Sequence, residues 1–220
     1  MSSRVRILAN LRRRLEEGRP AAERAEGVTA RLRLAGAQTA PRPAASRLEG
    51  AEALARFEEK SRAVDASVSH VRSFADLPQA LAQELRARNL PAAIRMGEDP
   101  DLTALDWSGL EASRGPGRIE EPATLSRAVC GAAETGTLAL RSGPENPVTL
   151  TFLGETHFIV LRRSEIVPGF EELWARVRRS GAQPRTVNLV TGPSRSADIG
   201  GVLQLGAHGP VAVHVFIVDD

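Results

Sequence analysis

The chain has 220 residues, of which 42% are hydrophobic and 25% are charged, and its formal net charge is +2. This size fits one substantial core in a single domain with an appendage. The longest apolar runs are of strand length, far short of the ~20 residues of a membrane-spanning helix. The start is charged and lacks the apolar core of a signal peptide, so we expect a cytoplasmic protein with no membrane partner. The single cysteine, Cys130, excludes an internal disulfide and a cysteine-ligated zinc or iron–sulfur cluster.

Residues 1–45 are predicted to form a helix and a connector outside the main domain. Apolar residues from Val5 to Leu15 recur at helical spacing and stop before Gly18 and Pro20, which predicts one helix. Residues 18–50 mix proline, alanine and arginine without a clean period, which predicts a connector with little structure of its own.

This N-terminal arm carries ten arginines and four glutamates up to Arg42, a balance of +6 that leaves −4 for the rest of the chain. A basic arm can dock on an acidic partner, on nucleic acid or on an anionic surface. The glutamates interleave with the arginines, which favours a solvated helix face. We therefore expect no nucleic-acid partner.

Residues 46–220 are predicted to form one α/β domain. Its first part alternates helices with short apolar strands, namely a helix at 51–64, a strand at 67–71, a helix at 77–89 and a strand at 91–95. This alternation predicts a parallel or mostly parallel sheet with helices on its faces. From residue 128 onward, the pattern predicts strands at 138–141, 148–152, 157–161, 187–190 and 211–218, with one helix at 170–179.

A loop of ligand-binding character, Thr191–Asp198, follows the predicted strand 187–190. In open α/β sheets, ligands bind beyond the carboxyl ends of strands, where Gly and Ser/Thr leave backbone N–H groups free for an anion. The alternative is a polar turn in which Ser194 or Ser196 caps the next element.

A second loop of the same character, Ala132–Thr137, precedes a strand that ends in Ser142-Gly143-Pro144. With Glu155-Thr156-His157, Thr191–Asp198, Gly206–Pro210 and the terminal Val215–Asp220, these segments form an ordered set from about Ser126 to Asp220. The set resembles the lactate-utilization protein C family, the LUD-domain proteins.

The resemblance implies a three-layer α/β fold like that of CoA transferases, ribose-5-phosphate isomerase and glucosamine-6-phosphate deaminase, here with an N-terminal helical arm. It also implies a component of L-lactate oxidation to pyruvate that acts with separate iron–sulfur partner proteins. No GxGxxG or Walker motif accompanies the loops, so we expect this chain to bind no cofactor itself.

Two residues are the candidates for catalysis. Glu134 could be a general base, a nucleophile or an anchor for a substrate hydroxyl, and its structural alternative is to accept loop N–H groups. His208, in a glycine-rich turn, is suited to proton transfer or anion contact near neutral pH. The histidines and acids show no metal-ligand spacing, so no metal site is predicted.

The predicted pocket binds a small carboxylate or phosphate. Arg195 offers two parallel donors to such an anion, and its alternative is an ion pair with Asp198. The predicted ligand-binding residues are Thr135, Gly136, Thr137, Thr191, Gly192, Ser194, Arg195, Ser196 and Asp198.

Three functions remain open at this point. The first is an enzyme or enzyme subunit whose pocket binds a hydroxy or keto acid. The second is a non-catalytic assembly subunit that binds its cluster-bearing partners through the basic arm. The third is a CoA- or acyl-transfer enzyme with Glu134 as nucleophile. Because oxidation of lactate needs an electron acceptor that no motif here provides, the sequence favours a subunit over a self-sufficient dehydrogenase.

Overall fold

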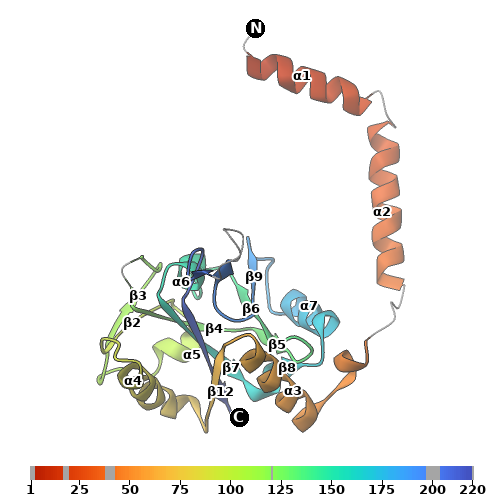
Figure 1. The fold of residues 1–220 in the computed structure, drawn as a ribbon. Coiled ribbons are helices and arrows are strands. Elements are labelled where there is room, and N and C mark those ends of the chain that lie inside the picture. The colour runs from red at the N-terminus through yellow and green to blue at the C-terminus, as the bar shows by residue number, and fades with distance from the viewer. Residues whose placement is uncertain (1–2, 17–19, 38–42, 120, 197–203, 220) are drawn as a thin grey trace. The chain divides into compact units, whose positions relative to one another are not determined.

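A computed structural model describes residues 3–16, 20–37, 43–119, 121–196 and 204–219. The chain divides into two compact units, residues 1–42 and residues 43–220, and each is described by itself. Figure 1 shows the elements of both units.

The described residues of the first unit form two helices, α1 (Ser3–Glu16) and α2 (Ala21–Ala37). The prediction of a helix up to Leu15 is confirmed. The prediction of an unstructured connector is wrong for residues 21–37, because alanine, leucine and arginine are strong helix formers even where no apolar period is visible. Among the described helices, none is long and apolar enough to cross a membrane.

A six-stranded parallel sheet forms the centre of the second unit, which confirms the expected parallel arrangement (Figure 1). In spatial order its strands are β1 (Ser67–Val71), β12 (Ala212–Val218), β7 (Thr156–Arg162), β4 (Ala123–Arg127), β2 (Ala93–Met96) and β3 (Glu111–Arg114). The central strands β7 and β12 are almost completely buried, because elements cover both faces of the sheet.

One face of the sheet packs against α4 (Leu77–Ala87). Leu77, Leu81 and Leu85 are spaced four residues apart, so they share one helix face and are buried against the sheet. The helix is followed by Asn89 at φ 56°, the left-handed conformation in which asparagine often ends a helix. The short elements η2 (Phe74–Asp76) and α5 (Pro100–Thr103) follow the carboxyl ends of β1 and β2.

The other face packs against α3 (Gly50–Ala63) and a second, four-stranded sheet. That sheet has the order β8 (Ile166–Val167), β5 (Cys130–Ala132), β6 (Thr137–Arg141) and β9 (Val187–Val190). Helix α7 (Phe170–Arg179) covers its outer face through the buried Leu173 and Val177. The remaining elements are η1 (Ala44–Arg47), α6 (Val148–Phe152), η3 (Arg163–Glu165), β10 (Arg195–Ser196) and β11 (Gln204–Leu205).

The prediction of a strand at 148–152 is wrong, because these residues form α6. Their valine, threonine and phenylalanine are typical of strands, but the segment starts after Pro147, whose N–H-free ring suits a helix start. Thr124 on β4 donates a hydrogen bond of 2.8 Å to the carbonyl of Leu150, which fixes the short helix against the sheet. Tertiary contacts thus override local propensity here.

The strand order creates a topological switch point between β2 and β4. From β2 the chain continues to β3, which lies on one side of this point. After β4, the next strand of the same sheet is β7, which lies on the opposite side. In open α/β sheets, connections that diverge in this way leave a crevice beyond the carboxyl ends of the two strands. Residues 97–99 and Arg127 lie at this place.

Candidate functional site

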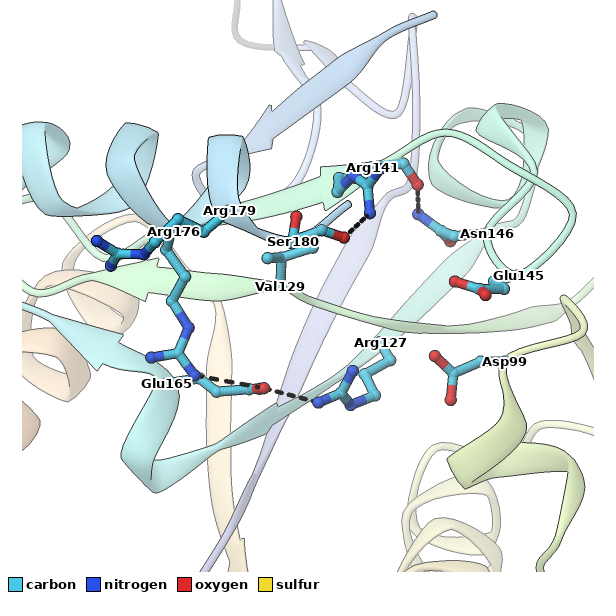
Figure 2. Close-up of a pocket in the computed structure, with 10 residues that line it drawn as sticks. All are labelled: Asp99, Arg127, Val129, Arg141, Glu145, Asn146, Glu165, Arg176, Arg179 and Ser180. Atoms are coloured by element: carbon cyan, nitrogen blue, oxygen red, sulfur yellow. Dashed lines mark hydrogen bonds and ion pairs between the residues drawn. The ribbon is translucent and has the colours of Figure 1, made fainter. Parts of the chain in front are cut away.

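A cavity of about 420 Å³ lies at this switch point, and we refer to it as the switch-point pocket (Figure 2). Ten residues line it: Asp99, Arg127, Val129, Arg141, Glu145, Asn146, Glu165, Arg176, Arg179 and Ser180. They come from the carboxyl ends of β2 and β4, from the loop after β6, and from η3 and α7.

Asp99 follows β2 and caps the N-terminus of α5. Its Oδ1 accepts hydrogen bonds from the backbone N–H groups of Asp101 (3.0 Å) and Leu102 (3.2 Å). Pro100 occupies the first helical position, where a missing N–H costs nothing. Burial raises the pKa of Asp99 above its ordinary value, even though the charge of Arg127 opposes the shift. A carboxyl group of this kind is suited to proton transfer.

Arg127 ends β4 and is held by carboxylates from two other segments. Its Nη2 donates a hydrogen bond of 2.6 Å to Oε1 of Glu165, and its Nε lies 3.4 Å from Oδ2 of Asp101. Arg162 reaches the same Asp101 oxygen at 2.9 Å. These ion pairs fix the guanidinium at the wall of the pocket, as Figure 2 shows for the pair with Glu165.

Glu165 lies in η3, just after β7, and is only 7% exposed. Burial raises its pKa, while Arg127 acts in the opposite direction. Its other oxygen, Oε2, accepts the backbone N–H of Arg162 at 3.3 Å, and Arg176 of α7 approaches Oε1 at 3.7 Å. Glu165 therefore joins β4, η3 and α7 at one point.

The opposite wall is formed by the loop after β6. Arg141 donates to the carbonyl oxygen of Ser180 at 2.5 Å and also to that of Ala182, which ties β6 to the end of α7. Asn146 donates to the Arg141 carbonyl at 3.3 Å, and its own Oδ1 is buried without a partner in the described part of the chain. Figure 2 shows Glu145 and Asp99 on facing sides of the same space.

Gly97 allows this loop to approach β2. A Cβ at Gly97 would lie 2.0 Å from the carbonyl oxygen of Glu145 and 2.9 Å from Cδ of Pro147. The N–H of Glu98 donates a hydrogen bond of 3.0 Å to the Pro144 carbonyl in the same contact. A residue without a side chain is therefore required where the two walls of the pocket meet.

The charge of the pocket suits a small anion. Four arginines and three carboxylates line it, so an organic anion with one negative charge would balance the lining. Guanidinium groups can bind a carboxylate through two parallel hydrogen bonds, and a buried carboxyl can exchange a proton with a ligand hydroxyl.

The predicted loop 191–196 lies at the opposite edge of the parallel sheet. It follows β9, which belongs to the second sheet, and it contacts segments that precede parallel strands. The Ser194 N–H donates to the carbonyl of Pro210 before β12 (2.9 Å), and Arg195 forms an ion pair with Asp65 before β1. Arg195 and Ser196 form β10, which pairs with β11, and Asp198 lies outside the described residues.

The structure brings the two predicted loops together through their threonines. The side-chain oxygens of Thr135 and Thr137 are 2.7 Å apart, and those of Thr137 and Thr191 are 2.8 Å apart. Gly136 and Gly192 have φ values of 70° and 78° and pack against the end of α3 and its continuation. A Cβ added at Gly136 would lie 2.6 Å from the backbone nitrogen of Ser61, and one added at Gly192 would lie 2.4 Å from the carbonyl oxygen of Val64.

Both predicted catalytic residues make contacts within the chain. Oε1 of Glu134 accepts the backbone N–H of Phe170 at 2.9 Å, at the start of α7, where a carboxylate also interacts favourably with the helix dipole. His208 is exposed and donates its backbone N–H to Ser194 Oγ at 3.3 Å. Neither residue lines the switch-point pocket. Their catalytic roles stay predictions, as do the ligand contacts of the two loops.

Sequence reasoning did not single out Asp99, Arg127 or Glu165. One signal was present, since Asp99-Pro100 follows the strand after two intervening residues and is a typical N-cap with proline at the first helical position. Arg127 and Glu165 gave no comparable signal, because their proximity depends on the pairing of β4 with β7.

Comparison with known proteins supports the resemblance seen in the motifs. Residues 122–218 match the family model of the LUD domain. "Uncharacterized protein YkgG" of Escherichia coli K12 is 25% identical over 73% of this chain and 71% of its own length. "Lactate utilization protein C" of a Geobacillus species (strain WCH70) is 36% identical over 40% of this chain and 38% of its own length.

A solved structure supports the fold. The crystal structure of a DUF162 family protein from Deinococcus radiodurans superposes with a TM-score of 0.56 and 24% sequence identity, covering 78% of this chain and 99% of that chain. At this identity the likeness concerns the fold alone. The matches to lactate utilization protein C relatives span only about two fifths of those proteins.

Proposed function

The chain belongs to the LUD-domain family through residues 122–218, and on this premise we propose that it takes part in lactate utilization by binding a small carboxylate such as L-lactate or pyruvate. Relatives from Geobacillus, Anoxybacillus and Bacillus that are named lactate utilization protein C support the pathway. The matched segment contains Arg127 and Glu165 of the switch-point pocket, while Asp99 lies before it.

The observation that carries this proposal is the position of Arg127 beside the buried Asp99 at the topological switch point. In the proposed complex, the ligand carboxylate faces the arginines of the pocket. Of the two carboxyl oxygens of Asp99, only Oδ1 accepts hydrogen bonds from the residues that the structure describes. Oδ2 is therefore left to accept a hydrogen bond from the hydroxyl of a 2-hydroxy acid. The volume of about 420 Å³ is ample for such a ligand.

Oxidation of lactate also requires an electron acceptor. In our proposal, separate iron–sulfur proteins supply it and this chain is a subunit of the system. CoA or acyl transfer through Glu134 has less support, because Oε1 of this residue accepts the Phe170 amide. A purely assembling subunit would leave the pocket without a ligand.

Isothermal titration calorimetry with L-lactate and pyruvate tests the proposal. Asp99→Asn and Arg127→Lys keep the size of each side chain approximately and are expected to weaken binding about tenfold, since a hydrogen bond to a charged group contributes ~1.5–3 kcal/mol. Arg195→Gln serves as the matched variant at the other edge of the sheet.

Each outcome separates the alternatives. If binding weakens in Arg195→Gln and not in Asp99→Asn or Arg127→Lys, the ligand binds at the loops predicted from the sequence. If wild-type protein binds neither acid, the carboxylate-binding function is contradicted and the assembly role gains support.

A further inference from the structure

A second cavity, of about 750 Å³, lies on the other side of the last turn of α7. The segment that leads from α7 to β9 forms its second wall. It shares no lining residue with the switch-point pocket. Its volume falls within the ~300–1,000 Å³ typical of sites for organic ligands.

The inner wall of this cavity is apolar and includes an aromatic ring. Trp174 and Val177 come from α7, and Pro184 and Val187 from the facing segment. The indole of Trp174 is half-buried at the edge of the small hydrophobic cluster beneath α7. A partly exposed indole in a concave wall offers a flat surface for ring stacking.

Two arginines provide the polar part. Arg178 and Arg185 line the cavity and are exposed, and none of the lining residues is acidic. Within the residues that the structure describes, neither guanidinium has an acidic partner. Free guanidinium groups beside a ring surface favour phosphate.

We propose that this cavity binds a planar heteroaromatic ligand that carries phosphate, of the nucleotide type. The ring stacks on Trp174, and the phosphates lie between Arg178 and Arg185. The site is independent of the switch-point pocket and of the carboxylate that we assign to it.

Titration of the full-length protein with ADP and with FMN, by calorimetry and by indole fluorescence, tests this site. Adenosine and riboflavin, which lack phosphate, and pyrophosphate, which lacks a ring, are the partial probes. We expect ADP or FMN to bind and to quench part of the indole fluorescence, which comes from Trp107 and Trp174 together, and each partial probe to bind at least tenfold more weakly. Stacking on an aromatic side chain and charge-assisted hydrogen bonds each account for a change of that order.

Variants assign the binding to these residues. Trp174→Leu and the double change Arg178→Gln with Arg185→Gln should each weaken binding about tenfold or more. Arg86→Gln, an exposed arginine on α4, is the matched control and should leave binding unchanged. Trp174→Phe retains a ring and should retain most of the affinity, which guards against loss of folding in the leucine variant.

Three results would overturn the proposal. The first is that neither ADP nor FMN binds to the wild-type protein. The second is that binding persists unchanged in the double arginine variant, and the third is that Arg86→Gln loses binding to the same extent as that variant.

Discussion

The guanidinium of Arg127 donates a hydrogen bond of 2.6 Å to the carboxylate of Glu165, and this contact joins the ends of two neighbouring parallel strands. Both residues line the switch-point pocket. Because burial raises the pKa of Glu165, its native carboxylate is harder to ionise than in the unfolded chain. Ionisation of Glu165 therefore makes the stability of the protein depend on pH.

The stability of the Glu165→Gln variant should increase relative to that of the wild-type protein as the pH rises. Because the native pKa is raised, the native state binds more protons than the unfolded state at pH values just above the ordinary glutamate pKa. The wild-type protein therefore loses stability as the pH rises through that range. Glutamine lacks this loss. Denaturant unfolding at pH 4, 5.5 and 7 measures it.

Glu58→Gln is the control of opposite sign. Burial raises the pKa of Glu58, but hydrogen bonds from Arg62 and His70 outweigh it and the net shift is downward. The glutamine variant should therefore lose stability relative to wild type as pH rises. The same trend in both variants would contradict our interpretation of Glu165.

Two buried histidines should destabilise the native state in acid. Burial lowers the pKa values of His157 and His214 to about 3, with Arg88 adding to the effect at His214. Unfolded histidine binds a proton below pH ~6.5, so unfolding becomes easier by about 1.4 kcal/mol per pH unit for each residue between there and the native pKa.

His214→Gln should remove about half of the histidine contribution to the slope of the unfolding free energy against pH. His214 lies between the hydroxyls of Ser67 and Ser69, at 2.7 and 2.9 Å, and glutamine can replace some of these bonds. Unfolding free energies at pH 6.5, 5.5 and 4.5 provide the slope, and His70→Gln, at a half-exposed site, is the comparison. An unchanged slope in His214→Gln would show that this histidine is already charged.

Gly97→Ala should damage the switch-point pocket. The new Cβ would overlap the Glu145 carbonyl, so the loop must move away from β2, at a cost of about 2 kcal/mol or more. Carboxylate binding should weaken in parallel. Gly109→Ala is the matched control, because nothing lies within 4 Å of its Cβ position. Thermal unfolding and calorimetric titration measure both effects, and equal stability of the two variants would contradict the close approach.

Leu81→Ala should destabilise the protein by ~2–5 kcal/mol, because Leu81 is fully buried between α4 and the sheet. Leu205→Ala, at a residue that is 52% exposed, should change stability by less than about 0.5 kcal/mol. Chemical denaturation of both variants is the measurement. A small effect at Leu81 would mean that the helix repacks over the cavity.

Deletion of residues 1–42 should leave the melting temperature of residues 43–220 nearly unchanged, because the two units are separately compact. If the basic arm docks on the iron–sulfur partners, the deletion should abolish their co-purification. Retained association would remove the arm from the interface, whereas loss of folding would contradict the division into units.

Periodicity predicted much of the fold. The helix at 170–179 and the strands at 67–71 and 187–190 have the predicted bounds. In the helix, the apolar spacing reflects a face that is buried through Leu173 and Val177. The segment from 110 to 132 was not predicted to contain strands, although β3, β4 and β5 lie there. These strands are short and contain alanine, serine and glycine, so local propensity is weak.

The site was harder to predict for a topological reason. The sequence shows that Thr191–Asp198 follows a strand, but it does not show that this strand belongs to the second, mostly antiparallel sheet. The carboxyl-end rule for ligand sites applies to β2 and β4 instead. Only the strand order, which depends on pairs far apart in the chain, identifies Asp99 and Arg127.

The position of β12 has a consequence for synthesis of the protein. This strand lies between β1 and β7, so within the described part of the chain residues 67–71 pair only with residues 214–218. While the ribosome is still adding residues before Ala212, β1 has no partner strand and the hydrogen-bonding edge of β7 stays open. Completion of the parallel sheet must therefore wait until residues 212–218 have emerged from the ribosome. Until then, nascent chains expose two strand edges that chaperones would have to protect from aggregation.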